Sequence, residues 1–310
     1  MEKEYKIPSS DGIHMLHCVS WNPVGPSKAV IVLVHGMMEH IGRYEEFVSY
    51  LCGRGYAVYG YDQLGHGRTA RNTAELGFFA EKHGEQMVIK DIHRVVSAVK
   101  KRHPKRDVIL FGYSMGSFFC RKFYTVYGAE VDGLILCGTG STPVPVLGAG
   151  YLLSKAICLV KGKKYRSSLL HSLVFSSNNK AIPNPETERD WLTKDKEKLA
   201  ENMEDPFCNF RFTARAYQDF FYIMYNLSRK QGYRKMPTDK PVLLISGGLD
   251  PVGHQGEDVA ALYDTYRELG MNRVSLILCE EDRHEILNET DRRAVYRQIG
   301  KWLEERNQDK

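Results

Sequence analysis

Ser114, Asp250 and His284 are the residues of this chain whose types and order could support nucleophilic catalysis. A serine hydroxyl is a weak nucleophile until a base takes its proton, and the base must itself be held by a third group. In this interpretation Ser114 is the nucleophile, His284 the base and Asp250 the acid that orients the base. The expected chemistry is two-step acyl transfer through a covalent acyl-enzyme, for which we predict no cofactor and no metal.

The surroundings of Ser114 favour a nucleophile over an ordinary glycine-rich turn. Ser114 is the middle residue of GYSMG (112–116), which follows an expected strand at 108–111 and precedes a helical pattern at 117–127. A serine on so sharp a turn has a strained backbone, and the residues two positions away must be small. Gly112 and Gly116 meet that requirement. A strand before GxSxG and a helix after it are the context in which this motif indicates a nucleophile.

Asp250 and His284 each come shortly after an expected buried strand, at 241–246 and 274–278 respectively. In open α/β sheets, sites assemble at the carboxyl ends of the strands. The order serine, acid, histidine is also the one that accompanies a strand-turn-helix nucleophile. The alternatives are a turn-capping role for Asp250 and a surface position for His284. Asp258 is the nearest rival acid, but it falls in the helix that follows.

An oxyanion hole is expected from the backbone amides of Met37 and Met115. The strand at 29–34 runs into a loop that contains Gly36, and a loop at this place supplies one N–H while the residue after the nucleophile supplies the other. Each such donor contributes about 3–4 kcal/mol of transition-state stabilisation. His35 and His40 lie five residues apart and could suggest a metal site, but we expect no further ligands nearby. We expect His35 to pack and hydrogen-bond beneath the site instead.

Alternating strand and helix patterns surround these residues and predict how they are positioned. Continuous apolar runs occur at 29–34, 57–61, 107–111 and 133–137, and again at 242–246 and 274–278. Helical spacing of apolar residues occurs at 44–54, 85–102, 257–269 and 291–306. Strands that are apolar throughout are typical of a parallel sheet buried on both faces. We therefore predict a mostly parallel α/β sheet with helices on both faces, and an antiparallel hairpin at its edge that includes 13–21.

The alternation stops in the middle of the chain, where the sequence reads as helices and loops. We predict an α/β core formed by residues 1–139 and 237–310, with a helical cap of residues 140–236 inserted between two strands. An apolar stretch in the cap, 147–160, is interrupted by Lys155 and is expected to fall short of a membrane span. The slightly longer segment 144–160 precedes a run of basic residues. It could be a membrane-facing lid followed by basic residues, or a helix that roofs an acyl channel, and we favour the roof. The cap is also rich in aromatic residues, a minority of which should line the pocket.

The composition is that of an ordinary soluble domain. The chain has 310 residues, of which 43% are hydrophobic and 26% charged, and the formal net charge of +5 is too small to indicate a nucleic-acid partner. The seven cysteines are widely spaced and form no CxxC pair, which favours free thiols in a reducing compartment. The first residues lack the apolar segment of a signal peptide. We expect a cytoplasmic protein.

Several motifs in combination resemble one family. HGMMEHIGRY (35–44), YDQLGHGRT (61–69) and GYSMG (112–116) look like the monoacylglycerol lipase and lysophospholipase branch of the α/β-hydrolases. The patterns GxDxVG around Asp250 and RHExxNE around His284 fit the same branch. Met38 stands where a small residue is usual and Thr69 replaces a frequent serine. Within the second motif, we expect Asp62 and His66 to hold a sharp loop beside the site rather than to take part in catalysis.

The resemblance implies the α/β-hydrolase fold and a serine hydrolase that cleaves carboxylic esters, most simply monoacylglycerols or lysophospholipids. A short-chain carboxylesterase or a thioesterase is the main alternative. An aminopeptidase is less favoured, although Glu201, Glu204 and Asp205 could supply an acidic site for a free amine. A ligand-binding protein that keeps the three residues but turns over slowly is a further alternative. The expected partner is a small acyl ester. If the apolar stretch of the cap is a lid rather than a roof, transient contact with a membrane surface is expected as well; the sequence does not indicate an oligomeric state.

Overall fold

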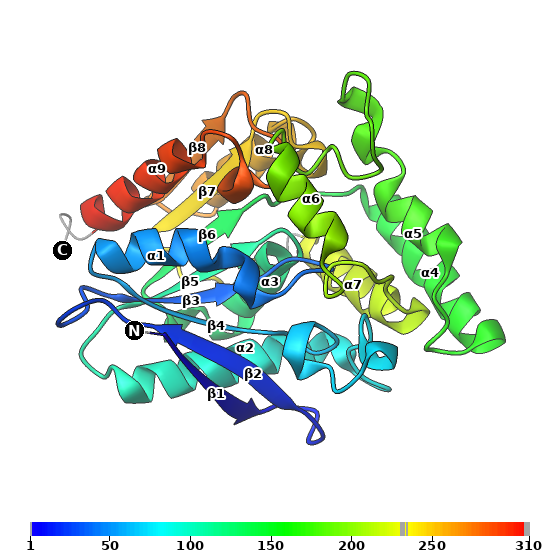
Figure 1. Ribbon diagram of the computed structural model, residues 1–310, viewed down its shortest axis with the longest axis horizontal. Coiled ribbons are helices and arrows are strands. Elements are labelled where there is room, and N and C mark those ends of the chain that lie inside the picture. The colour runs from blue at the N-terminus through cyan, green and yellow to red at the C-terminus, as the bar shows by residue number, and fades with distance from the viewer. Residues whose placement is uncertain (1, 230–232, 234, 307–310) are drawn as a thin grey trace.

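A single β-sheet forms the centre of the computed structural model, which describes residues 2–229, 233 and 235–306 (Figure 1). Its strands are β1 (Glu2–Pro8), β2 (Met15–Trp21), β3 (Val30–Val34), β4 (Ala57–Tyr61), β5 (Val108–Tyr113), β6 (Gly133–Cys137), β7 (Val242–Gly247) and β8 (Val274–Cys279). Their order across the sheet is β1-β2-β4-β3-β5-β6-β7-β8. The neighbouring strands from β4 to β8 pair in parallel, whereas β1 with β2 and β2 with β4 are antiparallel. The predicted mostly parallel sheet is confirmed.

Helices cover both faces of the sheet, which explains why its central strands are apolar throughout. In β3, Val30, Val32 and Val34 belong to one buried cluster, and Ile31 and Leu33 to the other. Successive side chains of a strand point to opposite faces, so both sets need a cover. The first face is covered by α2 (Gly84–Arg102), α3 (Met115–Tyr127) and α8 (Glu257–Glu268), and the second by α1 (Glu45–Gly53) and α9 (Arg292–Glu305).

The antiparallel edge has one strand that the sequence analysis does not predict. β2 lies in the predicted hairpin segment, and its partner is β1, in which Glu2, Lys3 and Glu4 are exposed. An edge strand needs no continuous apolar run, because solvent reaches one side and charges there discourage pairing with other chains. The charged residues of β1 therefore hide its strand character from a search for apolar runs.

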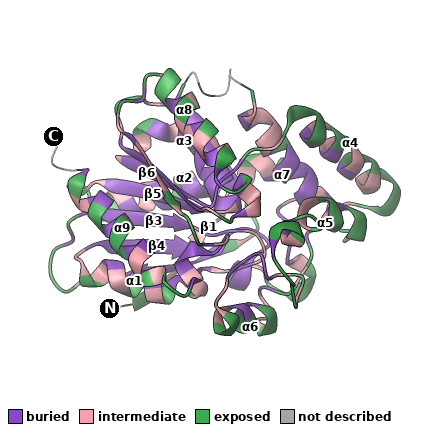
Figure 2. Ribbon diagram, turned by 90° about the horizontal axis from the view of Figure 1, so that it is seen from above, coloured by how far each residue is buried: buried purple, intermediate pink, exposed green. Residues whose placement is uncertain are grey.

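Four α-helices lie between β6 and β7 within the described residues, beside the carboxyl ends of the parallel strands (Figure 1). They are α4 (Val144–Lys161), α5 (Ser168–Phe175), α6 (Lys196–Glu204) and α7 (Ala214–Leu227). α7 packs against α2 and α3 of the core, and α4 packs against α7. Figure 2 shows α4 largely exposed on the far side of α7 from the sheet. We refer to the segment from Gly140 to Met236 as the cap.

The length and composition of α4 correct one expectation from the sequence. α4 has 18 residues and is long and apolar enough, by length and composition alone, to cross a membrane. The expectation that this stretch falls short of a span is therefore wrong by that measure, because Lys155 and Lys161 lower the mean hydropathy of an otherwise apolar helix little. Its contact with α7 uses a narrow stripe of Leu147, Gly150 and Ser154. An added Cβ on Gly150 would lie 2.9 Å from the Phe221 ring, so the two helices approach closely there.

Candidate active site

Ser114 lies on a strained turn between β5 and α3. Its backbone angles are φ 49° and ψ −121°, in a region that residues with a side chain rarely adopt. A Cβ on Gly112 would lie 2.6 Å from the carbonyl oxygen of Gly116 and 2.7 Å from Cys120 Sγ. A Cβ on Gly116 would collide with the backbone carbonyls of Val34 and His35. Both positions therefore require glycine, as the sequence predicts.

Ser114, His284 and Asp250 meet at the carboxyl ends of β5, β8 and β7. His284 Nε2 lies 2.8 Å from Ser114 Oγ, and His284 Nδ1 lies 2.8 Å from Asp250 Oδ2. With the Nδ1 proton donated to the carboxylate, Nε2 is free to accept the serine proton. Asp250 is fully buried and also accepts hydrogen bonds from Ser246 Oγ (3.1 Å) and the Val252 amide (2.9 Å). The rival acid Asp258 instead contacts His254 at 2.7 Å.

The electrostatic surroundings of His284 favour a strong base. Burial by itself lowers the pKa of this imidazole, but the Asp250 carboxylate, with smaller effects from Glu285 and Glu39, raises the pKa above its ordinary value. An imidazole held in this way takes a proton more readily from a neighbouring hydroxyl. The arrangement is that of a general base next to a nucleophile.

Two backbone amides beside Ser114 are available to bind an oxyanion. Gly36 passes so close to the nucleophile that its Cβ would lie 3.1 Å from Ser114 Cβ, and Met37 lines the same cavity as Ser114. Met115 is the first residue of α3, where N–H groups have no acceptor inside the helix. Among the described residues, neither the Met37 nor the Met115 amide donates to a protein acceptor. The Met38 amide, in contrast, points to His66 Nε2 at 3.4 Å.

A buried cluster that sequence reasoning missed connects the loop of Met37 with the loop of His284. Arg43 donates two hydrogen bonds of 2.8 Å to Glu285 and one of 3.2 Å to Glu39. Glu39 also accepts from the Gly36 amide and from Tyr44 Oη (2.7 Å). Burial raises the pKa of the Glu39 carboxyl; burial also acts to raise that of Glu285, but Arg43 more than offsets it and the pKa is lowered. The i, i+4 spacing of Glu39 and Arg43 was a signal in the sequence, whereas nothing there indicated Glu285.

The polar residues of the 61–69 motif hold a loop, as predicted. Asp62 accepts hydrogen bonds from the amides of Ile41 (2.9 Å) and Arg68 (2.8 Å), and His66 contacts the carbonyl of Leu64 (3.0 Å). His35 is fully buried beneath the site, and burial lowers its pKa to about 4, so it is neutral at pH 7.

His40 lies in a cluster that the sequence could not reveal. Its Nε2 is 2.8 Å from Asp205 Oδ2, and the ligand-type atoms of His40, Asp205 and Cys208 lie within 4.8 Å of one another. The expectation that no further ligand-type residue lies near His40 is therefore wrong in three dimensions. His40 Nδ1 accepts from the Gly42 amide at 3.2 Å, which leaves the proton on Nε2 for Asp205. This tautomer fits a hydrogen bond from His40 in the core to Asp205 in the cap. A metal bound at Nε2 would require the other tautomer, with the proton on Nδ1.

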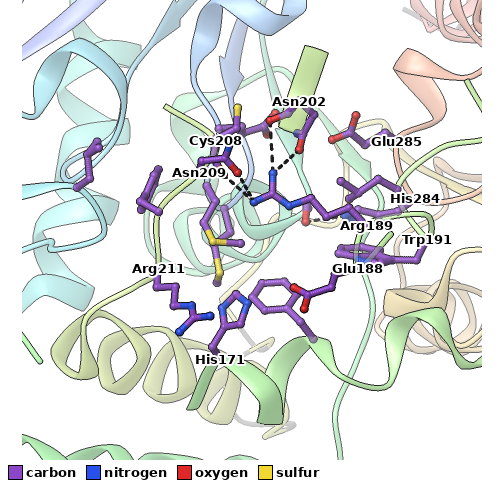
Figure 3. A pocket seen from close by; sticks show the side chains of 18 of the residues that line it. His171, Glu188, Arg189, Trp191, Asn202, Cys208, Asn209, Arg211, His284 and Glu285 are labelled. Carbon is purple, nitrogen blue, oxygen red and sulfur yellow. Dashed lines mark hydrogen bonds between the residues drawn. The ribbon is translucent and has the colours of Figure 1, made fainter. Parts of the chain in front are cut away.

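Ser114 and His284 open into a cavity of about 1270 Å³ between core and cap (Figure 3). Its apolar lining includes Met37, Met38, Leu76, Phe175, Trp191 and Phe210. The polar lining includes Arg166, Arg189, Arg211, His171 and Glu188. Of the aromatic cap residues, Trp191 and Phe210 line the cavity, while Phe212, Tyr217 and Phe220 pack in the core, in line with the prediction. No residue of α4 lines it, so the predicted roof is wrong: α5 and the segment 188–211 take that place.

Comparisons with known proteins place the chain in a family. Residues 25–291 match the model of the family described as serine aminopeptidase, S33. The chain is 23% identical to a monoacylglycerol lipase of Mycolicibacterium smegmatis over 304 residues, which are 97% of this chain and 96% of that protein. It is 36% identical to human monoglyceride lipase over 117 residues, which are 36% of this chain and 34% of that protein.

Solved structures show the same architecture. A carboxyl esterase from Bacillus coagulans is 27% identical, with a TM-score of 0.92 over 98% of both chains. A soluble variant of monoglyceride lipase from Saccharomyces cerevisiae is 18% identical, with a TM-score of 0.77 over 98% of this chain and 94% of that one, and shows the fold alone. The sheet order, the serine turn and the match over residues 25–291 lead to one conclusion. The chain is an α/β-hydrolase and belongs to the serine aminopeptidase S33 family.

Proposed function

We propose that the protein is a carboxylic ester hydrolase that cleaves monoacylglycerols or lysophospholipids through an acyl-enzyme on Ser114. The observation that carries the proposal is the hydrogen-bond chain from Ser114 Oγ through His284 to Asp250, with both contacts at 2.8 Å. The serine faces a cavity much larger than a short ester needs. The names of the similar proteins, among them monoacylglycerol lipases and a carboxyl esterase, support ester chemistry.

The proposed reaction has two steps. Ser114 Oγ attacks the ester carbonyl while His284 Nε2 takes its proton, and the amides of Met37 and Met115 stabilise the negative oxygen that forms. The C–O bond to the alcohol then breaks, and His284 returns the proton to the departing alkoxide. A water molecule attacks the acyl-enzyme with His284 again as base, which releases the carboxylic acid and restores Ser114. Asp250 stays ionised and stabilises the imidazolium in both steps.

Hydrolysis by wild type and Ser114→Ala tests the proposal. The substrates are p-nitrophenyl esters from acetate to palmitate, 1-monoacylglycerols and lysophosphatidylcholine, and Ser141→Ala, an exposed serine beyond β6, is the matched control. We expect wild type and the control to be active and Ser114→Ala to lose at least a thousandfold. Long chains should be preferred, because each buried methylene contributes about 0.8 kcal/mol. Equal rates for wild type and Ser114→Ala would show that Ser114 is not the nucleophile.

The same assay, extended to acyl thioesters and aminoacyl substrates, separates the alternatives. A preference for acetate or butyrate esters indicates a short-chain esterase, and a preference for acyl thioesters a thioesterase. Glu204 lines the cavity, whereas Glu201 pairs with Lys198 and Asp205 with His40. Glu204 and the family's description favour an aminopeptidase as the second candidate, and aminoacyl p-nitroanilides test it. Tight acyl-ester binding with negligible turnover on every substrate would instead indicate a ligand-binding protein.

Transient contact with a membrane surface and a cytoplasmic location complete the proposal. The outer face of α4 exposes Leu152, Leu159 and Val160, the last two by 80% and 78%, and basic residues follow the helix. Exposed apolar residues next to lysines suit the boundary between acyl chains and anionic headgroups. Wild type should sediment with anionic vesicles, whereas Leu159→Glu should stay in the supernatant. Val126→Glu, an exposed valine on α3 of the core, is the control, and an equal loss there would count against a specific role of α4.

A further inference from the structure

Three of the arginines that line the cavity have no carboxylate partner in the described part of the chain. Arg166, Arg189 and Arg211 take part in no ion pair there, whereas Arg43, which also lines the cavity, is paired with Glu39 and Glu285. A guanidinium stays charged at any pH relevant to the protein. The cap side of the cavity therefore carries positive charge that no carboxylate contact neutralises.

Two of these three arginines have N–H donors that no hydrogen bond to a described residue uses. Arg189 is fully engaged, since both of its terminal nitrogens contact oxygens of the segment 202–209. Arg166 uses Nη2 alone, for the carbonyls of Thr73, Ala74 and Leu76, and Arg211 uses Nη1 alone, for Ser168 Oγ at 3.0 Å. A guanidinium has five N–H donors arranged to fit carboxylate and phosphate oxygens. Arg166, which is half-buried, and Arg211, which is exposed, thus each keep further N–H groups to offer.

Both arginines are linked to the start of α5, Arg166 through its position in the chain and Arg211 through a side-chain contact. Arg166 lies two residues before Ser168, the first residue of that helix, and Arg211 contacts the Ser168 hydroxyl. His171, one turn further on, also lines the cavity and lies close to Arg211 in Figure 3. Burial lowers the pKa of His171, and Arg211 and Arg189 lower it further, which reports the positive field at this wall. The positive end of α5 adds to the same field.

The acidic residues of the cavity do not cancel this wall. Glu39 and Glu285 are committed to Arg43, and Glu204 forms no ion pair with any residue that the structure describes. Glu188 opposes the arginines at His171 but forms no ion pair with them within the described residues. An anion that binds at this wall would therefore meet guanidinium groups without displacing a carboxylate.

We propose that Arg166, Arg211 and Ser168 form a subsite for a phosphate group carried by the leaving part of the acyl substrate. The inference rests on the proposed function, and it narrows the substrate to esters or thioesters whose alcohol or thiol bears a phosphate. Two sources share this chemistry: a glycerophosphate, as in a lysophospholipid with a terminal phosphate, and a phosphorylated thiol such as coenzyme A. The acyl group passes to Ser114, and the phosphorylated alcohol or thiol departs with the proton from His284.

The ratio of two specificity constants tests the subsite. We compare kcat/KM for 1-oleoylglycerol 3-phosphate, oleoyl-coenzyme A and neutral 1-oleoylglycerol in wild type, Arg211→Gln and Arg166→Lys. The control is Arg229→Gln, an exposed cap arginine that does not line the cavity. Wild type should prefer one phosphorylated substrate over the neutral one, and whichever it prefers identifies the source. Arg211→Gln should lower that ratio about tenfold, the loss expected for one charged hydrogen-bonded pair, and Arg229→Gln should leave it unchanged.

A binding measurement keeps the test independent of turnover. Glycerol 3-phosphate should raise the melting temperature of wild type and Arg229→Gln but not of Arg211→Gln, and the effect should weaken with salt. If no ester is hydrolysed but this stabilisation holds, the proposed function fails and the anion subsite stands. If neutral esters are hydrolysed without any preference for phosphate, and glycerol 3-phosphate stabilises neither wild type nor control, the subsite is refuted and the esterase stands.

Discussion

Arg43 holds Glu285 through two hydrogen bonds of 2.8 Å, although the two residues are 242 positions apart in the chain. Glu285 follows His284, and Arg43 also contacts Glu39, which accepts from the amide of Gly36. The pair therefore joins the loop expected to bind the oxyanion to the loop that carries the base. A catalytic group works only when its parts keep their spacing, so this connection matters for both stability and rate.

Replacing Arg43 tests that connection. Arg43→Ala leaves two buried carboxylates without their partner, so we expect a loss of about 3–5 kcal/mol in the free energy of unfolding and a lower kcat. Urea denaturation and steady-state kinetics measure the two effects. Arg54→Ala is the control, because Arg54 pairs with Glu304 at a largely exposed site and should contribute about 0–1 kcal/mol. Equal losses in the two variants would contradict the role assigned to Arg43.

The pH profile should report the contact between Asp250 and His284. The base works only when neutral, so kcat/KM should fall as the pH drops through the pKa of His284, which Asp250 raises. In Asp250→Asn that carboxylate is gone, and burial, which lowers the pKa, is opposed only by the smaller effects of Glu285 and Glu39, so the acidic limb should move to lower pH. The rate itself should drop by about 10⁴, because the imidazole is no longer held in the correct tautomer. An acidic limb that stays in place or moves to higher pH would contradict this assignment.

Glycine at position 112 should be irreplaceable. In Gly112→Ala the new methyl group would lie 2.6 Å from the Gly116 carbonyl oxygen, so α3 must shift and Ser114 with it. We expect a loss of about 1–3 kcal/mol in stability together with most of the activity. Gly148→Ala in α4 is the matched control: nothing lies within 4 Å of the added atom, and it should stabilise the helix by up to about 1 kcal/mol. Thermal unfolding and ester hydrolysis measure both variants.

Asp219 should make the protein less stable as the pH rises. Burial raises the pKa of this α7 carboxyl to about 8, against an ordinary value of 3.8, although Arg215 contacts it at 2.7 Å. Between those two values the folded state binds more protons than the unfolded state, so the free energy of unfolding decreases with increasing pH. Asp219→Asn cannot ionise and should flatten the dependence between pH 5 and 8. Urea denaturation at several pH values measures the free energy of unfolding of both proteins. If it depends on pH with the same slope in Asp219→Asn as in wild type, the prediction is wrong.

The residues that act through local geometry were determined by the sequence itself. A sharp turn after a strand leaves no room for side chains, so GYSMG identified Ser114 and both of its glycines before any fold was known. Strands buried on both faces must be apolar throughout, so the position of β7, and with it the strand end that carries Asp250, followed from the sequence as well. The edge strand β8, which precedes His284, is only partly buried but is apolar enough to be found in the same way. The catalytic roles themselves stay predictions until they are measured.

The tertiary structure alone decided what depends on contacts between distant segments. Glu285 carries no local signal, because its partner Arg43 is far away in the chain. The helix α4 is apolar on most sides, so its pattern could not say which face is covered, and it lies outside α7 rather than over the cavity. Arg166 and Arg211 look like ordinary surface charges in the sequence, and they line the same cavity only after the cap has folded. Local sterics are encoded within a few residues, whereas charge neutralisation and cavity walls depend on which elements pack together.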